Sequence, residues 1–140
     1  MNKEFIPYEE AIALKELGFD ELCLAYYQKS SVIGDDTILP LIIRKEATNW
    51  NDNSFSKLGV PFYSAPLYQQ AFRWFREKYN MNICIQGFYN NSCRYSYTYR
   101  IYNHLHQLQD YEFNADTVNT YEVTELGCLK KLIEIVKDDG

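Results

Sequence analysis

The strongest structural signal in the sequence is a strict alternation of residue types between Arg94 and Asn103. One set of alternate positions carries large, mostly aromatic side chains: Tyr95, Tyr97, Tyr99 and Ile101. The intervening set is more polar and consists of Arg94, Ser96, Thr98, Arg100 and Tyr102. Because successive side chains of a strand point to opposite faces, this pattern predicts a strand with one buried and one solvated face. We expect the Tyr/Ile set to cover a core.

Other segments of similar length are also typical of strands. They are Leu22 to Gln28, Thr37 to Arg44, Asn82 to Tyr89 and a shorter one near Gln109 to Phe113. Turn residues at 29–36 and the Asn90-Asn91-Ser92 joint predict two hairpins, so the pairing should be antiparallel. Pro40 cannot donate to a ladder, which favours an edge position or a bulge for the second strand. Between Lys45 and Leu58 we find no periodicity.

Three segments have helical spacing of apolar residues: Pro7 to Leu17, Pro66 to Tyr79 and Tyr121 to Lys137. Gly18 and Asn80 are suited to end the first two helices, and Thr120 is suited to cap the third. Together the elements predict an α+β fold, with a mostly antiparallel sheet of about five strands packed against three helices. A length of 140 residues predicts a single domain spanning 1–140.

Composition and the N-terminal residues argue against several classes of function. The net charge of −5 disfavours a protein that binds nucleic acid, and no apolar run is long enough to span a membrane. The N-terminal residues lack the apolar stretch of a signal peptide, which predicts a cytoplasmic location. The four cysteines, Cys23, Cys84, Cys93 and Cys128, are dispersed, so we expect reduced thiols. Cys23, Cys84 and Cys128 lie in apolar stretches, where a free thiol behaves as a small core residue.

No motif in the sequence indicates catalysis. His104 and His106 could face the same way and gain an oxygen ligand from Asp110 or Glu112, but no second cluster completes a metal site. There is no Gly-x-Ser-x-Gly elbow and no glycine-rich phosphate loop. We therefore expect no catalytic residues, no cofactor and no bound metal, although a Cys-His site assembled only in space stays open. The balance favours a non-enzymatic protein.

Four residues are candidates for binding: Trp50, Arg94, Arg100 and Tyr102. Trp50 lies among Thr48, Asn49, Asn51, Asp52 and Asn53, so it either anchors its own segment or contacts a partner, as tryptophan often does at interfaces. Arginine beside aromatic rings can also grip a nucleotide. The strand alternation nevertheless separates Arg94 and Arg100 from the tyrosines that we expect to be buried.

Three stretches together suggest a resemblance to other proteins. They are Phe5 to Glu21, Ala65 to Tyr79 and Leu126 to Lys137, for example Ala-Pro-Leu-Tyr-Gln-Gln-Ala-Phe-Arg-Trp-Phe-Arg-Glu-Lys-Tyr in the second. They resemble a group of small proteins encoded by bacteriophages and mobile elements of Bacteroides-like bacteria. The resemblance lies in the expected helices and implies no catalytic residues.

These observations lead to one function hypothesis and one alternative. The hypothesis is a phage- or mobile-element-type protein that binds a protein partner in the cytoplasm, either a host-defence factor or a second copy of itself. The alternative is a protein that binds or sequesters a small ligand such as a nucleotide. Specificity in either case would depend on the 29–58 segment and on the tyrosine-rich hairpin.

Overall fold

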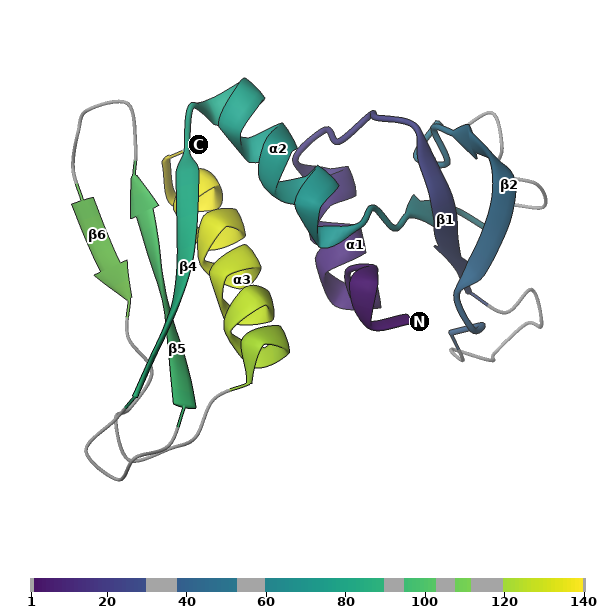
Figure 1. Cartoon of the computed structure of the whole chain (residues 1–140). Coiled ribbons are helices and arrows are strands. Elements are labelled where there is room, and N and C mark those ends of the chain that lie inside the picture. The colour runs from purple at the N-terminus through teal and green to yellow at the C-terminus, as the bar shows by residue number, and fades with distance from the viewer. Residues whose placement is uncertain are drawn as a thin grey trace. The chain divides into compact units, whose positions relative to one another are not determined.

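The computed structural model of this chain describes residues 2–29, 38–52, 60–89, 95–102, 108–111 and 120–139. In these residues the fold is α+β, with three α-helices and strands that pair antiparallel, so the predicted fold class is confirmed. The strands divide between two three-stranded sheets, and the chain divides into two compact units, Met1–Tyr68 and Gln69–Gly140. Figure 1 labels helices and strands of both units.

The first unit combines a helix with the sheet of strand order β2-β1-β3. A short 3-10 helix, η1 (Asn2–Glu4), precedes α1 (Tyr8–Glu16). The strands are β1 (Cys23–Gln28), β2 (Ile42–Thr48) and β3 (Phe62–Ser64). Both neighbours of β1 pair with it antiparallel, and α1 packs against β3.

The helix α1 ends next to Gly18, as the sequence predicts. Gly18 has a φ of 91°, in the left-handed region that glycine adopts without a Cβ clash. The Phe19 N–H donates to the Leu14 carbonyl at 2.9 Å, and the Gly18 N–H donates to the Lys15 carbonyl at 3.0 Å. This bond pair is the Schellman motif, which satisfies carbonyls that the helix leaves without partners. It also buries Phe19 beside the chain reversal.

The second strand begins later than the sequence pattern predicts. β2 covers Ile42–Thr48 instead of Thr37 to Arg44, so Pro40 lies before the strand, where its missing N–H costs no ladder bond. The strand also extends into the Lys45 to Leu58 segment, for which we predicted no periodic structure. β2 is an edge strand with both faces exposed over most of its length, so its sequence does not need to alternate between apolar and polar residues.

The second unit contains the other sheet, of order β4-β5-β6, and two helices. Its elements are α2 (Tyr68–Tyr79, whose first residue falls in the first unit), β4 (Asn82–Tyr89), β5 (Tyr95–Tyr102), β6 (Leu108–Tyr111) and α3 (Tyr121–Asp139). β4 and β5 form an uninterrupted register of eight residue pairs, from Asn82 opposite Tyr102 to Tyr89 opposite Tyr95. Asn80, with a φ of 57°, ends α2 as predicted.

The helix α3 covers one face of this sheet, through contacts with β5 and β4. Its N-terminus is capped by Thr120, whose hydroxyl accepts a 3.2 Å hydrogen bond from the Val123 N–H, as predicted. The predicted apolar stripe is largely buried: Leu129, Leu132, Ile133 and Val136 are inside, and Leu126 is half-buried. Trp74 and Phe75 on α2 are buried.

None of the helices in the described part of the chain has the length and hydropathy of a membrane-spanning segment.

Candidate binding face

The face of the second sheet that points away from α3 is exposed over most of β4 and β5. The register between β4 and β5 determines which residues belong to this face, because residues directly opposite each other in an antiparallel pair share a face. Asn82 lies opposite Tyr102, Cys84 opposite Arg100 and Gln86 opposite Thr98. We call this surface the open face and define it by seven residues: Asn82, Cys84, Gln86, Phe88, Thr98, Arg100 and Tyr102.

The burial of side chains follows the two faces of the sheet. Tyr99 and Ile101 are buried on the α3 side, as the sequence alternation predicts. On the open face Arg100 is exposed, and the exposed fractions of Tyr102 and Phe88 are 39% and 38%. Ser96, opposite Phe88, is buried, so the polar set of the alternation is not exposed along its whole length.

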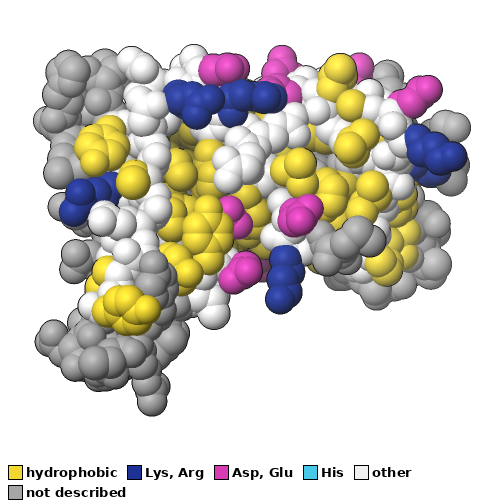
Figure 2. Space-filling model, viewed as in Figure 1, with side chains coloured by type: hydrophobic (Ala, Val, Ile, Leu, Met, Phe, Trp, Pro, Cys, Tyr) yellow, Lys and Arg dark blue, Asp and Glu magenta, His cyan; other side chains and the backbone are white. Residues whose placement is uncertain are grey.

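The open face combines aromatic rings and one guanidinium with uncharged polar groups. Its defined members on β4 and β5 include no Asp, Glu or Lys, whereas the register of β6 places Asp110 opposite Arg100. In the space-filling view, the described side chains at the left of the picture are yellow, white and dark blue (Figure 2). Tyrosine, phenylalanine and arginine are enriched in protein interfaces, and Lys, Glu and Asp are depleted there. In composition this face therefore resembles an interface core.

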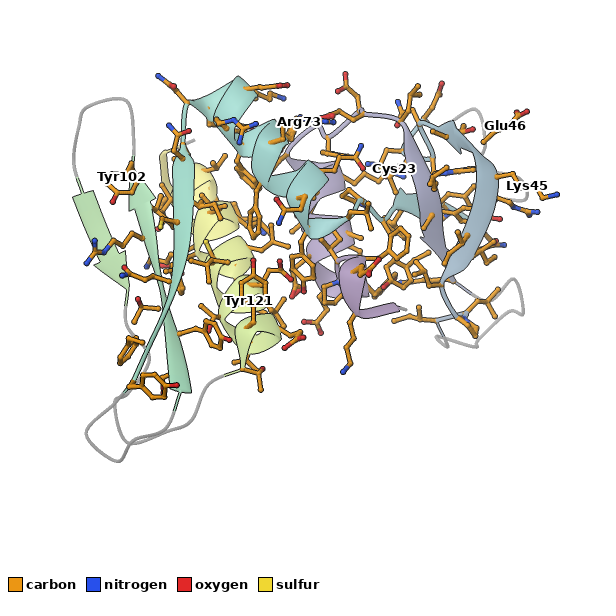
Figure 3. All side chains as sticks on the ribbon, in the orientation of Figure 1. Cys23, Lys45, Glu46, Arg73, Tyr102 and Tyr121 are labelled. Atoms are coloured by element: carbon orange, nitrogen blue, oxygen red, sulfur yellow. The ribbon has the colours of Figure 1, made fainter. Side chains whose placement is uncertain are left out.

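The structure brings two of the four predicted binding residues onto one face. Arg100 and Tyr102 lie on the open face, separated by one residue of β5; Tyr102 is labelled in Figure 3. Arg94 lies outside the described residues, and so do His104 and His106, the pair that the sequence analysis judged insufficient for a metal site. Trp50 belongs to the first unit, where its contacts point to a different role.

Trp50 holds its own segment against β1. Its indole N–H donates a 2.8 Å hydrogen bond to the Cys23 carbonyl, and its ring centroid lies 4.4 Å from that of Tyr26. The Phe62 ring stacks on Tyr26 with a centroid distance of 4.9 Å, and its centroid lies 6.3 Å from that of Trp50. The Arg44 guanidinium donates to the Tyr26 hydroxyl at 3.2 Å. Half-buried and bonded to the backbone, Trp50 works as an anchor for its segment.

Asn51 is a connector that the sequence analysis missed. Its side-chain amide donates to the Phe19 carbonyl at 2.9 Å, and its side-chain carbonyl accepts from the Ser64 N–H at 2.9 Å. One side chain thus joins the turn after α1 to strand β3. No local pattern could reveal Asn51, because both its partners are distant in the sequence.

A second aromatic group lies between α1 and the first sheet. The Tyr8 ring contacts Tyr27 and Tyr63 edge-on, with both pairs of centroids 5.6 Å apart. The Lys15 ammonium lies 4.9 Å from the Tyr63 ring centroid and donates to the Phe62 carbonyl at 2.9 Å. The Tyr27 hydroxyl donates to the Ile6 carbonyl at 2.9 Å.

The electrostatics of this aromatic group argue against chemistry there. Burial, and then the Tyr63 hydroxyl, raise the pKa of Tyr8 above its ordinary value. Burial, and then the Glu10 carboxylate, raise the pKa of Tyr27. Burial lowers the pKa of Lys15. Both phenols are therefore held in the neutral form, which is a poor base and a poor nucleophile. We interpret the group as packing.

The thiols differ in their surroundings, and one prediction about them is wrong. Cys23 and Cys128 are buried thiols, but Cys84 is exposed on the open face, not in a core. Its stretch looked apolar because Ile83 and Ile85 flank it, yet on a strand those neighbours point to the other face. Burial, and then the Glu125 carboxylate, raise the pKa of Cys128 to about 12, which keeps that thiol protonated and unreactive. Cys93 lies outside the described residues.

The pKa of one carboxyl group on α3 is also shifted. Burial, and then the neighbouring charge of Glu122, raise the pKa of Glu125 to about 6. Within the described residues no group of three or more His, Cys, Asp or Glu side chains is placed to hold a metal ion.

Comparison with known proteins yields no match: no family model, no curated protein and no solved structure is similar to this chain.

Proposed function

We propose that this protein is a non-enzymatic binding protein of the cytoplasm that engages a protein partner through the open face. The observation that carries the proposal is the exposure of Tyr102, Phe88 and Arg100 on one side of a sheet whose other side packs on α3. Large aromatic and arginine side chains are the residue types that most often supply binding energy at protein interfaces. The phage or mobile-element origin suggested by the helical segments belongs to the same proposal.

The neighbours of these residues also favour a protein partner. Asn82, Gln86 and Thr98 are uncharged and can donate or accept hydrogen bonds to a partner's backbone. Their desolvation costs much less than the desolvation of charged groups would. The surface thus combines rings that bury apolar area with polar groups that fix orientation.

A small nucleotide is the second candidate, and one observation favours it. Arg100 and Tyr102 share a face and are close in the strand, so a guanidinium and a ring could take a phosphate and a base. Two observations weigh against it. Only one cation belongs to the open face as defined, and the chain carries a net charge of −5, which repels phosphates. We therefore place the nucleotide second.

A double variant tests the proposal. Arg100→Ala combined with Tyr102→Ala should abolish capture of a specific partner from host cell extract, measured by quantitative mass spectrometry against the wild-type chain. The matched control is Tyr121→Ala, because Tyr121 is also a tyrosine with an exposed fraction of 39% but lies at the start of α3. The control should capture the partner normally, and all three proteins should melt within a few degrees of one another.

Two results would contradict the proposal. If the double variant and the wild type capture the same proteins in the same amounts, the open face is not the binding surface. If the wild type instead binds nucleotides in a calorimetric titration and the double variant does not, the second candidate replaces the first.

A further inference from the structure

The outer edge of β4 differs from the other sheet edges in the described part of the chain. An edge strand presents unpaired N–H and C=O groups that can pair with another chain, and natural proteins usually protect such edges. Charged residues, prolines, bulges and very short strands are the common means of protection. The four edge strands of the two sheets are β2, β3, β4 and β6, and they can be compared on this basis.

Three of the four edges are protected. β2 carries Arg44, Lys45 and Glu46 in succession, all exposed, and its pairing with β1 is irregular. Lys45 and Glu46 project outward from the strand (Figure 3). β3 has three residues and β6 has four. Strands this short can form only a few backbone hydrogen bonds with a partner strand.

β4 has none of these protections. It is eight residues long, and its sequence, Asn-Ile-Cys-Ile-Gln-Gly-Phe-Tyr, contains no charge and no proline. Its register with β5 runs without a shift over all eight pairs, so no bulge twists the edge away. Isoleucine, phenylalanine and tyrosine also favour extended backbone. On its outer side, no strand among the described residues pairs with it.

We propose that β4 pairs antiparallel with β4 of a second copy of this chain, which joins two three-stranded sheets into one of six strands. An antiparallel pair of identical strands is related by a two-fold axis, the most common symmetry of protein dimers. A strand without charge meets its own copy without opposing like charges, whereas β2 would bring its charged residues together. A register centred on Ile85 or Gln86 overlaps seven residues of β4 in each copy and supplies on the order of six to eight backbone hydrogen bonds.

The alternation of β4 also fits this pairing. If the two-fold axis passes through Ile85 or Gln86, odd-numbered residues of one copy lie opposite odd-numbered residues of the other, and even-numbered opposite even-numbered. The open faces of both copies then lie on the same side of the joined sheet. Ile83 and Ile85 of both copies then share the side that carries α3, and the two open faces become one continuous surface. The pairing uses backbone groups of β4 and leaves Arg100 and Tyr102 exposed, so it stands or fails separately from the proposed function.

The molar mass in solution tests the proposal. Light scattering on the full-length chain should give twice the 16.6 kDa of one chain. The variant Cys84→Lys with Gln86→Lys should give the mass of one chain, because in either register lysines of the two copies face each other across the new pair. The matched control, Gln69→Lys with Glu77→Gln, changes the net charge equally at exposed positions of α2 and should remain a dimer. The Arg100→Ala/Tyr102→Ala variant should also remain a dimer.

Hydrogen exchange keeps the test decisive if the lysine variant does not fold. In the wild-type chain, the amides of β4 should become more protected as protein concentration rises, while those of β5 should not change. A wild-type chain of single mass at high micromolar concentration would overturn the proposal. So would a dimer that the lysine variant leaves intact, or protection of β4 that is independent of concentration.

Discussion

At the residue scale, Trp50 and Asn51 show how single side chains hold a segment that lacks regular structure. Trp50 combines a hydrogen bond to the Cys23 carbonyl with ring contacts to Tyr26 and Phe62. Asn51 satisfies a backbone donor on β3 and a backbone acceptor after α1. Ordering a long connection costs conformational entropy, and these contacts offset part of that cost. Both residues therefore stabilise the first unit.

We predict that Trp50→Ala destabilises the protein by about 2–4 kcal/mol, because it removes a large half-buried ring and leaves the Cys23 carbonyl without this donor. Trp50→Phe keeps most of the ring contact and loses only the hydrogen bond, so its cost should be about 1 kcal/mol. Denaturant unfolding of the three proteins measures both. If Trp50→Ala unfolds like the wild type but loses the partner, Trp50 is a binding residue and our structural interpretation is wrong.

At the element scale, the accuracy of the sequence predictions depends on how local the determining interactions are. The boundaries of β4 match the prediction, and those of α1 and α3 match within two residues, because caps and alternation lie in the segments themselves. β2 was displaced and β3 was missed. β3 is only three residues long and pairs with Tyr26, Tyr27 and Gln28, far away in the chain. No local pattern encodes such a partner.

The helix α3 allows a direct test of the predicted core. Leu129 has no exposed surface, so Leu129→Ala should lower the free energy of unfolding by about 2–5 kcal/mol. The neighbouring Lys130 is exposed, and Lys130→Ala should change it by no more than about 0.5 kcal/mol. Chemical denaturation followed by circular dichroism measures the difference. Equal effects of the two substitutions would mean that α3 does not bury this face.

At the scale of the whole molecule, the sequence predicted the α+β class but not the division of the strands. A length of 140 residues is typical of one domain, and the single domain stays a prediction beside the two compact units of the structure. The candidate site was predicted in part. Arg100 and Tyr102 followed from strand alternation, whereas Cys84 and Gln86 became members only when the register of β4 was known. Register depends on pairing between strands, which composition does not reveal.

Cys84 supplies the most direct test of the claim that the open face binds a protein. It is exposed on that face, opposite Arg100, whereas Cys23 and Cys128 are buried, so a maleimide should label Cys84 selectively among these three. Peptide mass spectrometry gives the labelling rate of each cysteine in buffer and in host cell extract. We predict that the extract slows labelling of Cys84 several-fold in the wild type but not in the Arg100→Ala/Tyr102→Ala variant. Equal labelling rates of wild-type Cys84 in buffer and extract would contradict the account.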